Sequence, residues 1–273
     1  MGTNRGVLGT VVALAGTVVV GAAGALGIRA AQERMRRNSA ILNETLPVNS
    51  KWWRDYAKQE GSLLYVAIGD SAAQGIGAST PAHSYVGLIA ERMRELTGQS
   101  LRVVNLSVSG ATTALAVADQ LPKFRKLKPD LVTVAIGAND IVEFDAALFE
   151  ANIREVFATL PKHAIVADLP CFYLPWNERK VAVANRIVRE VAAEHGLEVV
   201  PLHETTRRRG LRGILTEFAI DLFHPNDGGY RVWASAFLPA VTASVVRRKG
   251  VRASTSMSIR PPDERAPAPT SAQ

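Results

Sequence analysis

From Ser62 onward, short apolar runs alternate with longer amphipathic segments. The runs are rich in β-branched residues, which is typical of buried strands. In the segments between them, apolar positions recur every three or four residues, as on one face of a helix. The pattern predicts five strands, at Leu63–Ile68, Leu101–Leu106, Leu131–Ile136, Ala164–Leu169 and Leu197–Leu202.

Helices are expected between these strands. The clearest one has a single apolar stripe, formed by Val86, Ile89, Met93 and Leu96. Val181 to Glu194 repeats this pattern and ends before Gly196, and a last helix is expected from about Asp227 to Val246. Because parallel strands need crossover connections, the order predicts an α/β fold, a doubly wound five-stranded parallel sheet with helices on both faces.

A long uncharged segment precedes this pattern. Gly6 to Ile28 comprises 23 residues rich in Val, Ala, Leu and Gly, and such a helix reaches about 34 Å, enough to cross a hydrocarbon core of about 30 Å. It predicts a single-pass N-terminal transmembrane helix and a membrane partner. The positive-inside rule favours a cytoplasmic body, because four arginines follow the segment. The alternative is export with a cleaved signal peptide, for which Ala23-Gly24-Ala25 resembles a cleavage site.

The chain is therefore divided into four parts. They are a membrane anchor with its basic flank (1–37), a stem (38–60), a folded domain (61–246) and a basic tail containing Pro and Ser that is predicted to be disordered (247–273). The stem contains Trp52, Trp53 and Tyr56. These rings either lie at the membrane interface or pack in the core.

The net charge of +7 lies at the two ends of the chain. Residues 1–37 carry five arginines against one glutamate, and residues 247–273 carry six basic against two acidic side chains, so the rest is net −1. Nucleic-acid-binding domains carry their basic residues on a folded surface, so no nucleic-acid partner is expected. Basic ends beside an apolar segment favour a membrane surface. A single cysteine, Cys171, excludes an internal disulfide.

Residues that can carry chemistry follow the predicted strands. Ser71, Gly110 and Asn139 come after the first, second and third strands, and His224 stands past the fifth with Asp221 three positions before it. In a doubly wound sheet, ligands bind beyond the carboxyl ends of the strands. Each residue alone is weak evidence, because Gly, Ser and Asn are common in turns. Together, at matching strand ends, they predict one site.

This set resembles the SGNH hydrolases, also called the GDSL esterase and lipase family, over roughly residues 61–246. The four block residues of that family are here Ser71, Gly110, Asn139 and His224. The resemblance implies the flavodoxin-like SGNH hydrolase fold and a serine esterase without metal or other cofactor. One departure is Ala72-Ala73 after Ser71, where the family often has Leu-Thr. That difference bears on the shape of the pocket.

The residue types suit acyl transfer. A serine hydroxyl needs an adjacent base, and His224 can take the proton of Ser71 and return it to the leaving group. Asp221 would orient the imidazole. The resemblance implies an oxyanion hole formed by the backbone N–H groups of Ser71 and Gly110 and by the side-chain amide of Asn139.

Other residues near these blocks are assigned to the substrate pocket, to a structural role or to no role. Three aromatic residues are candidates for the substrate pocket: Phe172, Tyr173 and Trp176. They either form an apolar wall for the acyl group or, as the alternative, lie buried against the neighbouring helix and do not contact substrate. Cys171 is interpreted as a small buried residue rather than a nucleophile. Asp70 and Asp140 are interpreted as structural. Histidines that match no block are given no role: His83, His163, His195 and His203.

The predicted function is a serine esterase or acylhydrolase that cleaves carboxylic esters through an acyl-enzyme intermediate, with a lipid, an acetylated sugar or a small ester as substrate. A first alternative is a metal-dependent phosphoesterase, whose candidate ligands are Asp70, Asn139, Asp140, Asp221 and His224. Metal sites of that kind usually gather several histidines, which this set lacks. A second alternative is a non-catalytic, membrane-tethered module of the same fold.

Overall fold

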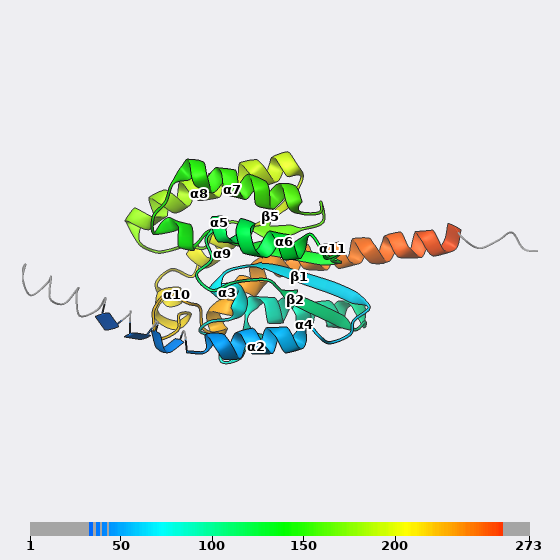
Figure 1. Cartoon of the computed structure of the whole chain (residues 1–273), viewed down its shortest axis with the longest axis horizontal. Helices are drawn as coiled ribbons and strands as arrows, with labels where there is room; N and C mark the ends of the chain where they lie inside the picture. The colour runs from blue at the N-terminus through cyan, green and yellow to red at the C-terminus, as the bar shows by residue number, and fades with distance from the viewer. Residues whose placement is uncertain (1–32, 35–36, 39, 43, 259–273) are drawn as a thin grey trace, which may run out of the picture.

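The computed structural model describes residues 33–34, 37–38, 40–42 and 44–258. These residues form a parallel sheet with the strand order β2-β1-β3-β4-β5 (Figure 1). Its strands are β1 (Leu63–Gly69), β2 (Leu101–Asn105), β3 (Leu131–Ala135), β4 (Ile165–Ala167) and β5 (Glu198–Val200). The prediction of a five-stranded parallel sheet is confirmed. The strand β5 ends earlier than predicted, before Pro201, which has no N–H group for the ladder.

Helices cover both faces of the sheet, as predicted. Figure 1 shows α7 and α8 on one side of β1, and α2 and α4 on the other. The helices of the first side are α5 (Thr113–Leu115), α6 (Leu121–Phe124), α7 (Ala146–Thr159) and α8 (Pro175–His195). Those of the second side are α2 (Leu46–Tyr56), α4 (Tyr85–Thr97), α9 (Leu202–Arg207) and α11 (Asp227–Ser258). Shorter elements are α3 (Ser71–Gln74), α10 (Gly210–Thr216), η1 (Pro81–His83), the π-helical η2 (Ala116–Gln120) and η3 (Asn139–Ile141).

The central strand β1 separates two hydrophobic cores. Tyr65 and Ala67 belong to the core beneath α4 and α11, whereas Val66 and Ile68 belong to the core beneath α7 and α8. All four side chains are fully buried, as expected for a parallel strand covered on both faces. Burying each large apolar side chain stabilises the fold by about 1.5 to 3 kcal/mol. The loop after β1 therefore starts from a rigid support.

The predicted stem packs into the folded body. It contains α2, which lies beside β2. Trp53 is 3% exposed within the α4 and α11 core, and Trp52 and Tyr56 pack against the same core. Core packing therefore places these aromatic rings, and the residues of α2 belong with the sheet that follows.

The last helix is longer than predicted. The helix α11 was expected to end at Val246, but it continues to Ser258, within the segment 247–273 that was predicted to be disordered. No proline stands between Val246 and Ser258, and Gly250 is the one strong helix breaker there. Residues 259–273 lie outside the described residues.

The predicted single-pass membrane anchor, and the localisation derived from it, need correction. In the part of the chain that the structure describes, no helix combines the length and the apolar character needed to span a bilayer. The segment on which the prediction rested, Gly6 to Ile28, lies outside the described residues. The length and apolar composition of this segment and the arginines after it were the basis of the prediction, and no helix of the described residues bears it out.

Candidate active site

The strand order places a crevice at the carboxyl end of β1. The chain leaves β1 for β2 on one side and then crosses to β3 on the other, so the connections diverge at this point. Such a switch point is where doubly wound sheets bind ligands. Ser71 is the second residue after β1, and Asn139 is the fourth residue after β3. Gly110, after β2, is carried to the same edge.

Three of the predicted residues form a continuous hydrogen-bonded chain. The Nε2 atom of His224 lies 2.9 Å from the Oγ atom of Ser71, and its Nδ1 atom lies 2.6 Å from Oδ2 of Asp221. All three residues are buried, with exposed fractions of 5% for Ser71, 6% for His224 and 1% for Asp221. The fold thus joins side chains that are 153 positions apart in the sequence.

The loop that carries His224 is shaped by Asp221. Its Oδ1 atom accepts hydrogen bonds from the backbone N–H groups of Phe223, at 3.1 Å, and His224, at 3.0 Å. A local turn of this kind is typical of aspartate. The loop also places Leu222 at a φ of 56°, in the left-handed region that non-glycine residues rarely adopt. One carboxylate therefore both fixes the turn and holds the imidazole.

The charge of Asp221 suits this second task. Its burial opposes ionisation, but the hydrogen bonds and the charge of His224 outweigh that effect and hold the pKa of Asp221 below its usual value. An ionised carboxylate accepts a proton-bearing Nδ1. The Nε2 atom is then left free to accept a proton from Ser71.

The turn that presents Ser71 is fixed from two sides. Asp70 caps α3, since its Oδ1 atom accepts from the backbone N–H of Ala72 at 3.0 Å. Gln120 of η2 binds the last residue of β1 twice: its Oε1 atom accepts from the N–H of Gly69 at 3.1 Å, and its Nε2 atom donates to the Gly69 carbonyl at 2.8 Å. Ser71, the nucleophile candidate, is therefore the first residue of a short helix whose N-terminus is held in place by these hydrogen bonds.

The three candidate oxyanion donors surround this turn. In the described part of the chain, the backbone N–H groups of Ser71 and Gly110 donate to no protein acceptor. Gly110 has a φ of 76°, which explains a glycine there. The side-chain amide of Asn139 donates to the Ala111 carbonyl at 2.9 Å and makes a long contact of 3.5 Å with Oδ2 of Asp70.

Asp140 connects the second and third blocks. Its carboxylate accepts from the backbone N–H of Thr113 at 2.9 Å and from the Thr113 hydroxyl at 2.6 Å. Burial raises the pKa of Asp140. The loop after β2 is thereby hydrogen-bonded to the residue that follows Asn139.

A second set of polar residues behind the site was missed by the sequence analysis. The side-chain amide of Gln74, at the end of α3, donates to the Ser107 carbonyl at 2.6 Å. From α2, Trp53 Nε1 donates to the backbone carbonyl of Gln74 at 3.1 Å, and Asn49 donates to the same carbonyl at 3.3 Å. The stem therefore supports the helix that carries Ser71. Of these residues, only Trp53 carried a signal in the sequence, as one of three aromatic residues in the predicted stem.

Burial makes Asp70 a pH-dependent element of the site. It raises the pKa of Asp70 to about 6 from an ordinary 3.8, against the opposing hydrogen bond from Ala72 and the charge of His224. Because the folded chain holds this proton more tightly than the unfolded chain, stability falls as the pH rises from about 4 to about 6. Ionising Asp70 in the folded state then costs about 3 kcal/mol.

Replacing Asp70 with asparagine is therefore expected to stabilise the chain by up to about 3 kcal/mol above pH 6, and to have little effect near pH 4. Asparagine keeps an oxygen for the Ala72 N–H and cannot ionise. Urea unfolding at both pH values measures the difference, and Asp119→Asn, at an exposed position, is the control. A gain that is equal at both pH values would contradict the assignment.

The three candidate pocket residues do not share one environment. Phe172 is partly buried against the α7 and α8 core, and the Tyr173 hydroxyl donates to the Thr206 carbonyl at 2.5 Å. Trp176, at the start of α8, is 64% exposed. Phe223, which the sequence analysis did not select, is 46% exposed, and its ring centroid lies 5.0 Å from that of His224.

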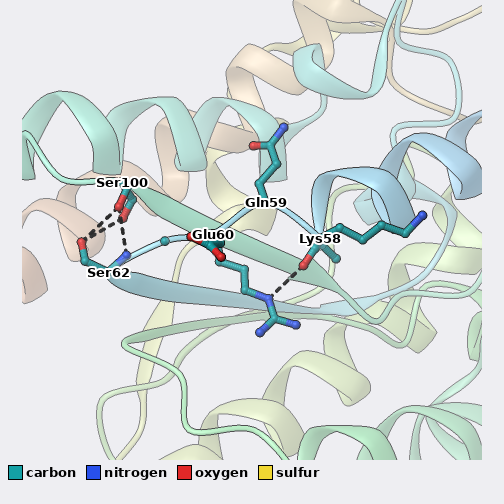
Figure 2. Close-up of a pocket in the computed structure, with 8 residues that line it drawn as sticks. Lys58, Gln59, Glu60, Ser62 and Ser100 are labelled. Carbon is teal, nitrogen blue, oxygen red and sulfur yellow. Dashed lines mark hydrogen bonds between the residues drawn. The ribbon is translucent and has the colours of Figure 1, made fainter.

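A separate hollow lies at the opposite edge of the sheet. Figure 2 shows its lining, which comes from the turn between α2 and β1 and from the start of β2. It has a volume of about 600 Å³ and is lined by residues 57–62 together with Ser100 and Arg102. These residues precede or begin the strands, whereas Ser71 and His224 lie at the carboxyl ends. The hollow is therefore remote from the candidate catalytic residues.

The residues of this site lie within a segment that matches a known protein family. Residues 67–232 match the GDSL-like Lipase/Acylhydrolase family. The match covers more than half of the chain and contains Ser71, Gly110, Asn139, Asp221 and His224. The chain belongs to the GDSL-like lipase/acylhydrolase family. This GDSL hydrolase is accordingly an enzyme that acts on ester bonds.

Individual relatives of this GDSL hydrolase agree with the family. Esterase TesA of Pseudomonas aeruginosa is 26% identical over 177 residues, which are 62% of this chain and 82% of that protein. An acetylxylan esterase of Geobacillus stearothermophilus is 27% identical over 181 residues, or 60% of this chain and 81% of that protein. The crystal structure of LAE5, an α/β hydrolase enzyme from the metagenome of Lake Arreo in Spain, is 28% identical with a TM-score of 0.56. It covers 68% of this chain and 98% of its own.

Proposed function

We propose that this hydrolase is a serine esterase that forms an acyl-enzyme on Ser71. The observation that carries the proposal is the hydrogen-bonded chain from Asp221 through His224 to Ser71, with distances of 2.6 and 2.9 Å. A buried serine next to an imidazole, itself held by an ionised carboxylate, is the arrangement that activates a hydroxyl nucleophile.

The proposed reaction has two balanced halves. As the Ser71 Oγ atom attacks the carbonyl carbon of the ester, its proton passes to Nε2 of His224, and the carbonyl electron pair moves to the oxygen. Collapse of this tetrahedral intermediate breaks the bond to the alcohol oxygen, which takes the proton from His224. Water then repeats the sequence on the acyl-enzyme, releasing the carboxylic acid and restoring Ser71. Asp221 stays ionised throughout and stabilises the imidazolium.

The negative oxygen of the intermediate needs hydrogen-bond donors that the protein does not already use. The unpaired backbone N–H groups of Ser71 and Gly110 support their assignment as two of these donors. The amide of Asn139 would be the third, with the oxyanion replacing the long contact to Asp70. Losing one such donor typically costs about 2.7 to 4 kcal/mol of transition-state stabilisation.

The acyl and alcohol groups of the substrate are proposed only as a class: a lipid, an acetylated sugar or a small ester. Similarity to an esterase and to an acetylxylan esterase supports short acyl esters as the first substrates to assay. The exposed rings of Trp176 and Phe223 are the aromatic surfaces available to contact the substrate. Phe172 and the hydroxyl of Tyr173 are already engaged within the protein.

The metal-dependent phosphoesterase alternative predicts a different arrangement of ligands. Within the described residues, the carboxylates of Asp70, Asp140 and Asp221 do not form with His224 a group close enough to hold a metal ion. The nitrogen atoms of His224 are instead paired with a carboxylate and a hydroxyl. This geometry favours acyl transfer by side chains alone.

Hydrolysis of p-nitrophenyl acetate is therefore expected to continue at an unchanged rate after dialysis against EDTA. The reason is that none of the proposed steps uses a metal ion. The control substrate is bis(p-nitrophenyl) phosphate, which a metal-dependent phosphoesterase would cleave. Cleavage of bis(p-nitrophenyl) phosphate that is lost in EDTA and recovers on adding a divalent cation would overturn the proposed mechanism in favour of the phosphoesterase.

A further inference from the structure

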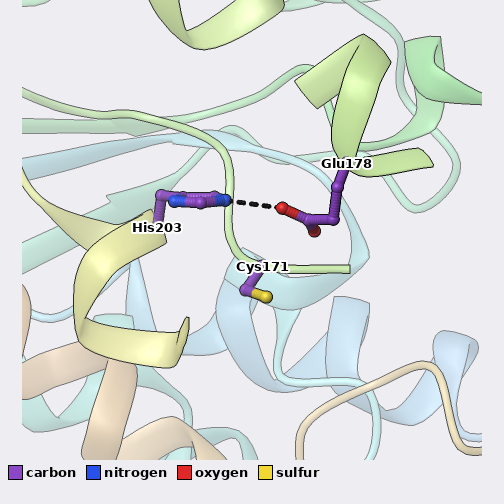
Figure 3. A group of neighbouring side chains, drawn as sticks. All are labelled: Cys171, Glu178 and His203. Atoms are coloured by element: carbon purple, nitrogen blue, oxygen red, sulfur yellow. Dashed lines mark hydrogen bonds and ion pairs between the residues drawn. The ribbon is translucent and has the colours of Figure 1, made fainter. Parts of the chain in front are cut away.

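A second group of chemically able side chains lies outside the catalytic residues. Cys171 follows β4, Glu178 is in the first turn of α8, and His203 is in the first turn of α9 (Figure 3). One ligating atom of each, the thiol sulfur, a carboxylate oxygen and an imidazole nitrogen, lies within 4.8 Å of both others. None of these residues has a part in the proposed reaction.

The Glu178 carboxylate is the centre of this group. Its Oε2 atom lies 2.8 Å from Nε2 of His203, and the sulfur atom of Cys171 lies within 4.8 Å of a ligating atom of each of these two residues. Its other oxygen accepts from the backbone N–H of Phe172. A carboxylate oxygen, an imidazole nitrogen and a thiol sulfur thus converge on one place, where a divalent cation could bind with release of the thiol proton.

We propose that Cys171, Glu178 and His203 form a binding site for a zinc ion. Thiolate, imidazole and carboxylate are the three ligand types that Zn²⁺ accepts, and three protein ligands with one open position for water is a known form of zinc site. A tetrahedral zinc holds its ligand atoms about 3.3 to 3.8 Å apart. The Glu178–His203 separation of 2.8 Å would therefore lengthen by about 0.5 Å, and no other separation in the group would shorten by more than about 1.5 Å.

Burial and charge around the group fit this assignment. Cys171 is buried, while the side chains of Glu178 and His203 are about a quarter exposed, at 27% and 25%, which leaves a route for an ion and a water ligand. The thiolate and the carboxylate together would neutralise the ion.

The ion would have a defined structural effect. The three residues come from the β4–α8 loop, from α8 and from α9, so a bound zinc would join all three elements. Between the first two ligands lie the candidate pocket residues Tyr173 and Trp176, and Tyr173 has a φ of 59°, an unfavourable conformation that its surroundings must hold. Zinc is expected to bind the folded chain selectively and therefore to raise its melting temperature.

The test measures the affinity of the full chain for Zn²⁺ by competition with a chromogenic chelator. The chain carries no histidine tag, and a phosphine reductant keeps the thiol reduced. We expect one Zn²⁺ per chain. Cys171→Ser, His203→Gln and Glu178→Gln should each weaken binding at least about tenfold, because even residues around the ligands contribute about 10- to 100-fold. The control is His163→Gln, which replaces a histidine at the opposite end of β4 and should bind as tightly as the unmutated chain.

Cobalt provides a readout that needs no variant. Co²⁺ bound to the unmutated chain is expected to show a thiolate-to-cobalt charge-transfer band, since Cys171 is the only thiol. Thermal melting followed by circular dichroism in EDTA shows which variants fold. If a variant does not fold, the cobalt spectrum of the unmutated chain alone tests the proposal. Absence of the band, or folded Cys171→Ser and His203→Gln variants that bind zinc as tightly as the unmutated chain, would overturn the proposal.

Discussion

Replacing Ser71 with alanine is expected to lower kcat for p-nitrophenyl acetate by about 10⁶-fold, the loss typical of removing a serine nucleophile. The Oγ atom of Ser71 has the imidazole of His224 as its hydrogen-bond partner, and alanine fits the same space in α3. The variant should therefore remain folded. Steady-state kinetics of the purified variant, with its melting curve, measures both effects.

The matched control for this variant is Ser235→Ala. Ser235 is an exposed serine of α11 whose hydroxyl donates to the Val232 carbonyl within the same helix. Its loss should change kcat less than about twofold, as for surface substitutions generally. If Ser71→Ala keeps more than about a hundredth of the activity while Ser235→Ala behaves normally, Ser71 is not the nucleophile.

Asp221→Asn is expected to lower kcat by about 10⁴-fold without unfolding the loop. Asparagine keeps an oxygen that can accept the backbone N–H groups of Phe223 and His224. It places an amide NH₂ against Nδ1 of His224, which must then accept a hydrogen bond. The imidazole proton moves to Nε2, where it blocks transfer from Ser71.

A second Asp–His pair in the chain provides the control for this effect. Asp227 is the first residue of α11, and its Oδ2 atom lies 3.1 Å from Nδ1 of His83. Within the described residues, no hydrogen bond joins this pair to Ser71. Asp227→Asn should leave kcat within a few-fold of the parent. Equal losses in Asp221→Asn and Asp227→Asn would mean that the first acts through general stability rather than through the histidine.

The sheet and the residues at its edge were predictable because their signals are local. Each strand lies in a short, largely apolar run, and the turn residues that follow it are close in sequence. The positions of Ser71 and Asn139 at one end of the sheet therefore follow from the parallel arrangement of the strands. The pairing of Asp221 with His224 is also local, since one turn contains both. The sequence pattern could indicate that these blocks lie at the same edge of the sheet. The distances between their side chains could be obtained only from the folded structure.

The supporting contacts were not predictable in the same way. Gln120 binds Gly69 across 51 positions, and Asn49 and Trp53 reach the end of α3 from a segment interpreted as a stem. Polar residues of this kind have no periodicity that reveals a distant partner. The zinc candidates illustrate the same limit, because Cys171, Glu178 and His203 have no recognisable spacing and meet only where the β4–α8 loop contacts α9.

The central claim is that Ser71 carries the acyl group, and the most direct test is covalent labelling. The purified chain is incubated with a fluorophosphonate, its intact mass is measured, and the modified peptide is sequenced by tandem mass spectrometry. We predict one adduct per chain, on Ser71, with loss of esterase activity in proportion to labelling. Full activity with no adduct, or an adduct at a residue other than Ser71 that accounts for the inactivation, would contradict the account.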